Sequence, residues 1–561
     1  MITSSPERIE AYTQKGWWRG HTLHGALLQQ SHDNPDMLAV ADQPDREQLT
    51  GDRPLRLSFA EVERASTNLA AQLLQAGITN DDAVIVQIPN IAELYISYMA
   101  LSKIGAIISP VPIQYGPHEL RHIAHTINAK AIITIARFKD QPLAGNGDLI
   151  SDLNLQALVF GHNLSVNSDL NSQSVNALQA HRQGYKDDAN NIITICWTSG
   201  TTGTPKGVPR SHNMWVATAT NVSEAADFRS GDRFLNIFPL VNMASVGALL
   251  YPSVLTGCSL FLHHPLDPAV FLGQLQDEQI SFTIAPPALL NQLAKSEQMW
   301  RRYDFSKLRS VGSGSTALAP WMIETFGRNY GVEVLNFYGS NEGISLFCTP
   351  LHCQDPETRA TMFPRLGCGS DPWGSYAGTT VLSKVVDVDS GEEITEVGKM
   401  GELLFNGATV FDGYTGTDNS DVFTTDGYFR TGDLVEICGE PGNFYRIAGR
   451  SKDIINRGGM KISPAEIDVL LEALPNSLEA AVCAYADEHL GEKICACVVA
   501  DPDGEPVNLD KVIEHLNSFG VAVFKLPERI ELFPALPRNP IGKVQRFVLQ
   551  EQVAQRIKES H

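Results

Sequence analysis

Alternating helical and strand-like segments near the start of the chain constrain the fold most strongly. Residues 59–76 place apolar side chains at helical spacing and end at Gly77, and the short β-rich run 83–88 follows. A second helical stretch, 92–105, precedes a second strand-like run at 106–112. Strands separated by helices pair in parallel, so the pattern predicts an α/β fold with mainly parallel sheets flanked by helices.

The chain is long enough for several domains, and its character changes along its length. It has 561 residues, whereas a domain usually takes roughly 100–200 residues. Strand-like segments separated by Gly and Asp turns occupy about residues 369–449, which predicts a small β-rich subdomain. Helices and strands mix again after it. We therefore expect an N-terminal domain of residues 1–451, which includes this subdomain, and a smaller α+β C-terminal domain of residues 452–561.

The acidic composition limits the kinds of partner. The chain carries 43 Lys and Arg residues against 64 Asp and Glu residues, which gives a net charge of −21 with histidine neutral. Non-specific binding to nucleic acid needs a cationic face, so we expect no nucleic-acid partner. Phosphate ligands stay compatible with this charge, because a few well-placed cations are enough to bind them.

The cysteines and the apolar segments indicate a reduced, cytoplasmic setting. The 9 cysteines are odd in number and scattered, and the first residues contain no apolar signal core. A group of three cysteines and one histidine at 348–368 lacks the two Cys-x-x-Cys pairs of a zinc site, so we expect no zinc there. The most apolar run, 237–257, is interrupted by prolines, which favours buried core over a membrane span.

A segment rich in glycine and hydroxyl groups is the most informative part of the chain. Residues 198–207 read Thr-Ser-Gly-Thr-Thr-Gly-Thr-Pro-Lys-Gly and follow a buried strand that we predict at 190–197. Glycines let backbone N–H groups approach a ligand, and hydroxyls and Lys206 bind phosphate oxygens, so the segment indicates a nucleoside triphosphate site. It is not a Walker loop, because Pro205 precedes the lysine and Gly207 follows it. We expect it to remain a loop; a surface turn is the alternative.

A second glycine pattern has a weaker meaning. Residues 311–317 fit Gly-x-Gly-x-x-Ala after a strand, so a dinucleotide fingerprint is a formal possibility. The match is isolated, and it lies deep in the chain instead of in an opening βαβ unit.

Several motifs occur in the order typical of one enzyme superfamily. Residues 199–207 resemble the signature loop of the adenylate-forming superfamily, which includes acyl-CoA synthetases, stand-alone aryl-acid adenylases, peptide-synthetase adenylation domains and firefly-type luciferases. The later motifs that resemble those of the family are 336–343, 401–403, 431–433, 449–453, 456–461 and 540–544. The resemblance covers nearly the whole chain, and stand-alone aryl-acid adenylases and CoA ligases are the most similar branch.

The resemblance implies that ATP is bound and gives the motifs roles around it. Asp433 would accept hydrogen bonds from the ribose hydroxyls, with Arg450 beside the ribose or a phosphate. Tyr338 would lie against the adenine base, and 314–316 would form a wall of its pocket. The full set implied for nucleotide binding, besides Asp433 and Arg450, is Thr198, Ser199, Gly200, Thr201, Thr202, Gly203, Gly314, Ser315, Thr316, Asn336, Phe337, Tyr338, Gly339, Ser340 and Asn341.

The resemblance also implies Mg²⁺ and three catalytic side chains. Glu342 is the carboxylate of its motif and would bind the metal together with phosphate oxygens. Lys206 and Mg²⁺ would serve the leaving pyrophosphate. Lys543 is the main catalytic candidate, because a cation between the acid and the α-phosphate would stabilise the transition state in which two anions meet.

The C-terminal domain is expected to move between two half-reactions, as in the family. Lys452 falls at the family's hinge position. One orientation would deliver Lys543 for adenylation, and the other would present Gly458, Gly459 and Lys461, which would line a tunnel for the incoming thiol.

The expected acid pocket departs from that of catechol-acid adenylases. The residues after Pro239 place Asn242, Met243, Val246 and Gly247 at the pocket. Met243 replaces the asparagine that binds a ring hydroxyl, and losing that hydrogen bond is costly for specificity, so a catechol substrate is not carried over. These side chains suit an aliphatic or a simple aromatic acid; core packing is the alternative for the small ones.

The leading hypothesis is an AMP-forming acid–thiol ligase. It would convert a small carboxylic acid and ATP into an acyl-adenylate and then transfer the acyl group to CoA. The alternative is a stand-alone adenylase that loads the phosphopantetheine of a carrier protein in siderophore or peptide synthesis. A non-catalytic nucleotide sensor and an NAD oxidoreductase are more distant hypotheses. A homodimer is compatible with the sequence, and we expect no membrane span.

Overall fold

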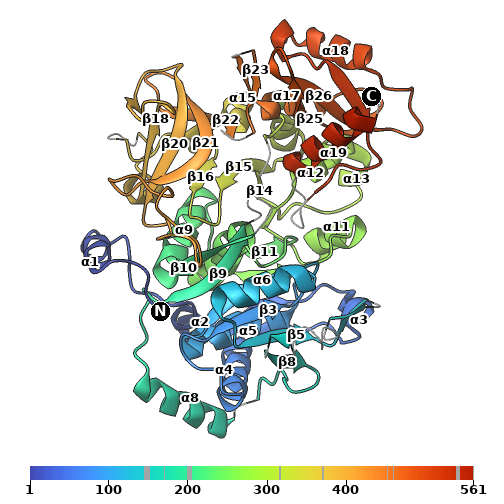
Figure 1. Ribbon diagram of the computed structural model, residues 1–561. Helices are drawn as coiled ribbons and strands as arrows, with labels where there is room; N and C mark the ends of the chain where they lie inside the picture. Colours follow the sequence, from blue (N-terminus) through green and yellow to red (C-terminus); the bar gives the residue numbers. More distant parts are fainter. Residues whose placement is uncertain are drawn as a thin grey trace.

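The computed structural model arranges the chain as a large body of two sheets, with a β-rich part and a C-terminal part above it (Figure 1). The β-rich part is drawn in orange and the C-terminal part in red, at opposite sides of the view. The structure describes residues 1–139, 141–143, 152–153, 155–169, 171–198, 205–314, 317–368, 372–450, 453–458, 460–538 and 544–559, without the side chains of Gln141 and Lys461.

The first sheet confirms the predicted helix–strand alternation. Its order is β10-β9-β4-β3-β5-β8, and every neighbouring pair is parallel except β10 with β9. The strands are β3 (Ala83–Gln87), β4 (Ile107–Pro110), β5 (Ala131–Ile135), β8 (Gln156–Phe160), β9 (Ile192–Thr198) and β10 (Lys206–Ser211). Helix α4 (Phe59–Gln75) begins at a capping box of Ser58 and Glu61, and α5 (Ala92–Ile104) ends at Gly105 in the left-handed region.

The second sheet carries most of the candidate site. Its order is β16-β15-β14-β13-β11-β12-β1-β2, with parallel pairs in the middle and an antiparallel pair at each edge. The strands are β1 (Leu38–Ala41), β2 (Arg56–Ser58), β11 (Arg233–Asn236), β12 (Ser259–Leu262), β13 (Phe282–Ile284), β14 (Ser310–Gly314), β15 (Glu333–Gly339) and β16 (Ser345–Cys348). The largest hydrophobic cluster takes side chains from both sheets, so they share one core.

Three helical segments pack in the core that the two sheets share. They are α9 (His212–Ala225), the π-helix η1 (Met243–Leu250) and α10 (Tyr251–Thr256), which continues η1 directly. All three contribute to the largest hydrophobic cluster, as expected for the apolar run 237–257. In the described part of the chain, no helix has the length and apolar character that crossing a bilayer requires.

The β-rich subdomain is confirmed, with one local correction. It is an antiparallel sheet in the order β17-β22-β21-β20-β18-β19. The strands are β17 (Met362–Pro364), β18 (Val381–Val386), β19 (Glu393–Ile394), β20 (Met400–Gly407), β21 (Phe429–Cys438) and β22 (Phe444–Arg450). The strand-like run that begins at Thr379 is helical at first, because Ser375 caps α16 (Tyr376–Thr380) by accepting a hydrogen bond from Gly378 N.

The C-terminal part combines a sheet with helices, as predicted. Strands β23 (Ile455–Arg457), β24 (Met460–Ile462), β25 (Ser477–Asp487), β26 (Gly491–Ala500) and β27 (Arg529–Leu532) form one sheet. The helices are α17 (Pro464–Leu471), α18 (Leu509–Ser518) and α19 (Arg546–Glu559). A hydrogen bond joins the C-terminal part to the large N-terminal body: Asn291 Nδ2 lies 3.5 Å from Glu472 Oε2. Asn291 belongs to α12 (Pro287–Lys295). The domain boundary at 451–452 lies outside the described residues and stays a prediction.

Both glycines of the pattern at 311–317, Gly312 and Gly314, lie in strand β14; residues 315 and 316 are outside the described residues. Gly314 ends β14 and pairs with Phe337 on β15, and a Cβ atom on Gly314 would lie 2.0 Å from the Phe337 carbonyl oxygen. In a dinucleotide fingerprint the glycines form the turn after the strand, so the arrangement departs from that motif. Glycine is needed here because the two backbones approach closely.

We expect Gly314→Ala to lower the melting temperature by about 2–6 °C, because the added methyl forces β14 and β15 apart. Gly327→Ala is the matched control, since a Cβ at Gly327 meets nothing within 4 Å. Differential scanning calorimetry measures both variants. Equal melting temperatures for the two variants would contradict the assignment.

Candidate functional site

The expected phosphate-binding segment, 198–207, begins and ends in a β-hairpin. Thr198 ends β9 and pairs with Lys206, the first residue of β10, and Gly207 pairs with Trp197. The expectation that all of 198–207 is loop is therefore wrong for Thr198, Lys206 and Gly207. The residues Ser199, Gly200, Thr201, Thr202 and Gly203 lie outside the described residues. The hairpin fixes where Lys206 projects.

Lys206 lies over an aromatic ring that the sequence analysis missed. Its Nζ is 4.8 Å from the centroid of the Tyr414 ring, within range of a cation–π interaction. The Tyr414 hydroxyl donates a hydrogen bond of 2.7 Å to Glu342 Oε1. One tyrosine thus touches the two side chains expected at the metal and the pyrophosphate. Tyr414 is 72 residues from Glu342 and outside every helix and strand, so no local pattern links the two.

Glu342 is held in a tight, mostly buried position. It is 9% exposed, and the next residue, Gly343, has φ of +112° with its Cα packed against the Thr409 backbone. Burial, followed by the Glu342 charge, raises the pKa of Tyr414, so its hydroxyl stays a donor at neutral pH. A lone carboxylate, with phosphate oxygens completing the shell, is an ordinary Mg²⁺ site, so the residues present fit that metal.

A second cluster joins the β-rich subdomain to β15. The Tyr338 hydroxyl donates to Asp433 Oδ2, and Arg450 Nε donates to Asp433 Oδ1 at 3.0 Å. Burial, then Asp433, raises the pKa of Tyr338 well above its usual value. Burial disfavours the charged form of Arg450. The acidic groups around it, Asp433 first, outweigh the effect of burial and raise the pKa of the guanidinium. The sequence analysis placed these three residues together at the nucleoside, and the structure brings them into contact.

The buried hydroxyl of Ser340 fits an incoming polar ligand. Its Oγ has no hydrogen-bond partner among the described residues, although it is shielded from solvent. A buried hydroxyl without a partner costs free energy unless a ligand supplies one. Ser340 lies two residues before Glu342, so a phosphate or ribose oxygen at the site would satisfy it.

The expected acid-pocket residues gather where η1 begins. Asn242 caps the helix by accepting hydrogen bonds from Ala244 N and Ser245 N. Asn341 Oδ1 accepts from Met243 N at 2.8 Å, and its amide nitrogen donates to the Trp197 carbonyl. The side-chain oxygen of Asn242 and both ends of the Asn341 amide are therefore engaged with the protein itself. π-helical segments often occur at functional sites.

The small residues of this pocket make room for Met243. A Cβ atom on Gly247 would lie 2.9 Å from Met243 Sδ, and one on Gly339 would lie 3.7 Å from Met243 Cγ. Val246 is fully buried and belongs to the largest hydrophobic cluster. The wall formed by these side chains is apolar.

A buried arginine ties the loop of Glu342 to helix α9. Arg210 is fully buried; its Nη1 donates to the Asn341 carbonyl at 2.8 Å, and its Nη2 donates to Met214 O and Thr218 Oγ1. Burial lowers the pKa of Arg210 to about 10, so it stays charged at neutral pH. No motif of the sequence gave Arg210 a role.

Some of the predicted site residues face elsewhere. Asn336 donates its amide hydrogens to the carbonyls of Arg359 and Ala360, and Phe337 packs edge-to-face on Phe347. Both hold β15 in place.

Gly458 and Lys461 lie around β23 and β24 in the C-terminal part. Ser315, Thr316, Lys452, Gly459 and Lys543 lie outside the described residues.

Comparisons with known proteins identify the family. The model of the AMP-binding enzymes matches residues 38–415, and that of the AMP-binding enzyme C-terminal domain matches 466–543. The chain is 28% identical to a salicylyl-CoA synthase / salicylate adenylyltransferase of a Streptomyces species, over 98% of this chain and 96% of that one. It is 29% identical to a salicyl-AMP ligase / salicyl-S-ArCP synthetase of Mycobacterium tuberculosis, over 98% and 93%.

The fold agrees with that of a solved ATP-bound structure. The ATP-bound structure of MatB from Rhodopseudomonas palustris superposes with a TM-score of 0.76 at 23% identity, and the match covers 95% of this chain and 99% of that one. Taken with the two matched models, the motif order and the clusters around Glu342 and Asp433, this shows that the chain belongs to the family of AMP-binding enzymes and is an ATP-dependent ligase.

Proposed function

We propose that this enzyme activates a small apolar carboxylic acid with ATP and transfers the acyl group to the thiol of CoA. The observation that carries the proposal is the convergence of two clusters from distant parts of the chain. Lys206, Tyr414 and Glu342 form one, and Tyr338, Asp433 and Arg450 form the other. The first suits a triphosphate, and the second suits a nucleoside.

In the first step, a carboxylate oxygen of the acid attacks the α-phosphorus of ATP. The bond from that phosphorus to the bridging oxygen breaks, and pyrophosphate leaves with the electron pair. Asp433 accepts hydrogen bonds from the ribose, and Arg450 orients the Asp433 carboxylate through the hydrogen bond from its Nε. Lys206 offsets the charge that develops on pyrophosphate, while Lys543 offsets the repulsion between the acid and the phosphate.

Mg²⁺ would be held by Glu342 and would neutralise charge on the phosphate oxygens when it is bound. Tyr414 fixes the direction of the Glu342 carboxylate through its hydrogen bond at 2.7 Å. Its ring also restrains Lys206. Tyr414 is thus a positioning residue for both charged groups.

In the second step, the thiol sulfur attacks the acyl carbon of the adenylate. The bond from that carbon to the phosphate oxygen of AMP breaks, AMP leaves, and the thiol proton passes to solvent. The domain would rotate about Lys452 so that Gly458, Gly459 and Lys461 line the path of the thiol.

The hydrogen bonds within the pocket favour a substrate acid that is apolar. The Asn242 side-chain oxygen and both ends of the Asn341 amide are already bonded to the backbone, and Met243 and Val246 offer no hydrogen bond. A ring hydroxyl bound there would lose its hydrogen bonds to water without replacement, which disfavours hydroxylated acids.

The acceptor thiol has a second candidate. One relative is named for a CoA product and the other for a product on a carrier protein, so transfer to a carrier-bound phosphopantetheine is the alternative. Both acceptors present the same thiol chemistry, and only product analysis separates them.

ATP–pyrophosphate exchange over a panel of acids tests the proposal. We expect exchange with benzoate and medium-chain aliphatic acids to exceed exchange with salicylate and 2,3-dihydroxybenzoate by about 10-fold or more, because the pocket lacks hydroxyl partners. Mass measurement of products with CoA and with a phosphopantetheinylated carrier identifies the acceptor. Preference for the hydroxylated acids would overturn the pocket assignment, and no exchange with any acid would overturn the activity.

Lys543→Ala separates the two half-reactions. We expect adenylation to fall by about 100-fold or more, because the cation acts only where two anions meet, while thioester formation from preformed acyl-adenylate changes little. Rapid-quench measurement of both steps checks this. Equal losses in both steps would rule out a lysine that serves adenylation alone.

Tyr414→Phe removes one hydroxyl and keeps the ring beneath Lys206. We expect the Mg²⁺ concentration for half-maximal exchange to rise about 10-fold, because a charge-assisted hydrogen bond to Glu342 is lost, with the KM of the acid unchanged. Tyr428→Phe is the matched control, since Lys384 Nζ lies 4.4 Å from the centroid of that ring, in the β-rich subdomain. If Tyr414→Phe responds to Mg²⁺ as the wild type does, Tyr414 does not position Glu342. ATP binding measured by calorimetry, with and without Mg²⁺, gives a second readout.

A further inference from the structure

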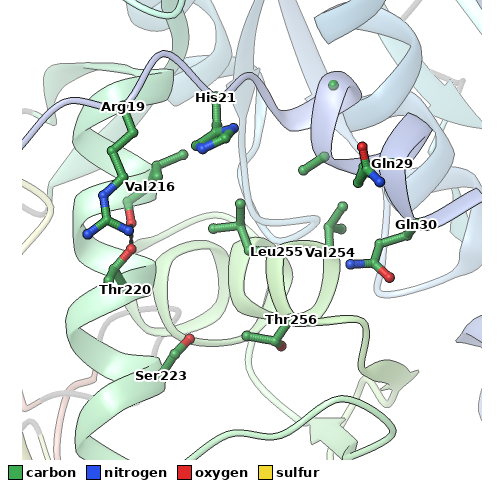
Figure 2. Close-up of a pocket in the computed structure, with 12 residues that line it drawn as sticks. Arg19, His21, Gln29, Gln30, Val216, Thr220, Ser223, Val254, Leu255 and Thr256 are labelled. Carbon is green, nitrogen blue, oxygen red and sulfur yellow. Dashed lines mark hydrogen bonds between the residues drawn. The ribbon is translucent and has the colours of Figure 1, made fainter. Parts of the chain in front are cut away.

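A cavity of about 400 Å³ lies along the stripe of α9 that carries Val216, Thr220 and Ser223 (Figure 2). Its walls are α9, α10, helix α2 (Leu23–Asp33) and the chain segment that leads into α2. Figure 2 shows the hydrophobic side chains of Val254 and Leu255 toward the middle, with Arg19 and His21 across from them. None of these residues belongs to the proposed catalytic machinery.

Helix α9 separates this cavity from the acid pocket. Val216, Thr220 and Ser223 line the cavity, and they follow one another at helical spacing along one stripe of α9. Trp215 and Thr218 lie on another stripe, where both approach Gly247 of the acid pocket. The cavity and the expected acid pocket therefore lie against different stripes of α9 and are distinct sites.

The lining combines an apolar floor with a cationic edge and contains no carboxylate. Val254 is fully buried and Val216 is 5% exposed. Arg19 forms no ion pair with any residue in the described part of the chain; its guanidinium stacks 5.0 Å from the centroid of the Tyr376 ring. The carboxylate of Glu224, close by on α9, accepts a hydrogen bond from Tyr376 N instead. The donors of Arg19 stay available in a chain whose net charge is −21.

We propose that this cavity binds a small organic anion, a carboxylate with an apolar body. Its volume lies in the range of roughly 300–1,000 Å³ that is typical of small-molecule sites. The apolar body would cover Val216, Val254 and Leu255, and the carboxylate would pair with the fork of guanidinium N–H groups on Arg19. The hydroxyl of Ser223 and the ring of His21 add polar contacts at the edge. This site is separate from the proposed acid-activation site.

Two dyes of the same shape test the charge requirement. The probe is 8-anilinonaphthalene-1-sulfonate, whose sulfonate stands in for the carboxylate, and its comparator is N-phenyl-1-naphthylamine, which lacks the anionic group. Fluorescence titrations are run with saturating ATP and Mg²⁺, so that the nucleotide site is filled. We expect saturable binding of one sulfonate dye per chain.

Three variants locate the dye. Arg19→Gln should raise the dissociation constant of the sulfonate dye about 10-fold, because one charge-assisted pair is lost, and leave that of the neutral dye unchanged. Ala26→Phe, from the α2 wall, should abolish binding of both dyes by filling the cavity. Arg302→Gln, on the surface elsewhere, should behave as the wild type.

The absence of a saturable signal in the wild type would overturn the proposal. Equal changes in the affinity for the sulfonate dye in Arg19→Gln and Arg302→Gln would overturn it too. Should Ala26→Phe fail to fold, the exposed Arg19 still decides the outcome. The acid-dependent exchange rate of Arg19→Gln should equal that of the wild type, so a failure here is distinct from a failure of the proposed activity.

Discussion

A buried guanidinium without an ion-pair partner in the described chain holds the candidate active site together. Arg210 donates to the Asn341 carbonyl and to two groups on α9, so strand β10, α9 and the loop before Glu342 meet at one charge. Burying a charge is costly unless hydrogen bonds satisfy it. Two carbonyl oxygens and the Thr218 hydroxyl do so for the Nη atoms without cancelling the charge, while Nε has no partner among the described residues. The remaining positive potential lies where an anionic substrate would approach, close to Glu342 and the end of the hairpin.

The same region shows how the enzyme keeps opposite charges apart until substrates arrive. Lys206 and Glu342 do not pair with each other in the described structure; Tyr414 lies between them and contacts both. A direct ion pair would neutralise the two groups and compete with the metal and the phosphates. An aromatic ring and a phenol hydroxyl restrain them at much smaller electrostatic cost.

Most of the architecture was predictable from local patterns, because the periodicity of apolar residues sets helices and strands directly. Helix α4 and strand β3 agree with prediction to within a residue or two at each end. The site was predictable only from the order of the family motifs. Tyr338, Asp433 and Arg450 are up to 112 residues apart, and no local pattern in the sequence indicates that their side chains are in contact. Tyr414 and Arg210 were missed because their contacts are tertiary. The hairpin at Lys206 was missed because glycine and threonine favour a loop, whereas pairing with β9 decides the backbone there.

The π-helical start of the η1–α10 segment carries an evolutionary consequence. A π-turn holds one more residue than an α-turn, and Met243–Leu250 runs without a break into Tyr251–Thr256. Loss of a single codon in this segment would remove the extra residue of a π-turn, so the segment could return to α-helical turns while the residues downstream keep nearly the same facing. Val254 and Leu255 would stay on the wall of the cavity beside α9, and the change would fall where η1 begins, at the acid pocket. One small genetic event could therefore reshape the acid pocket and leave the second site in place.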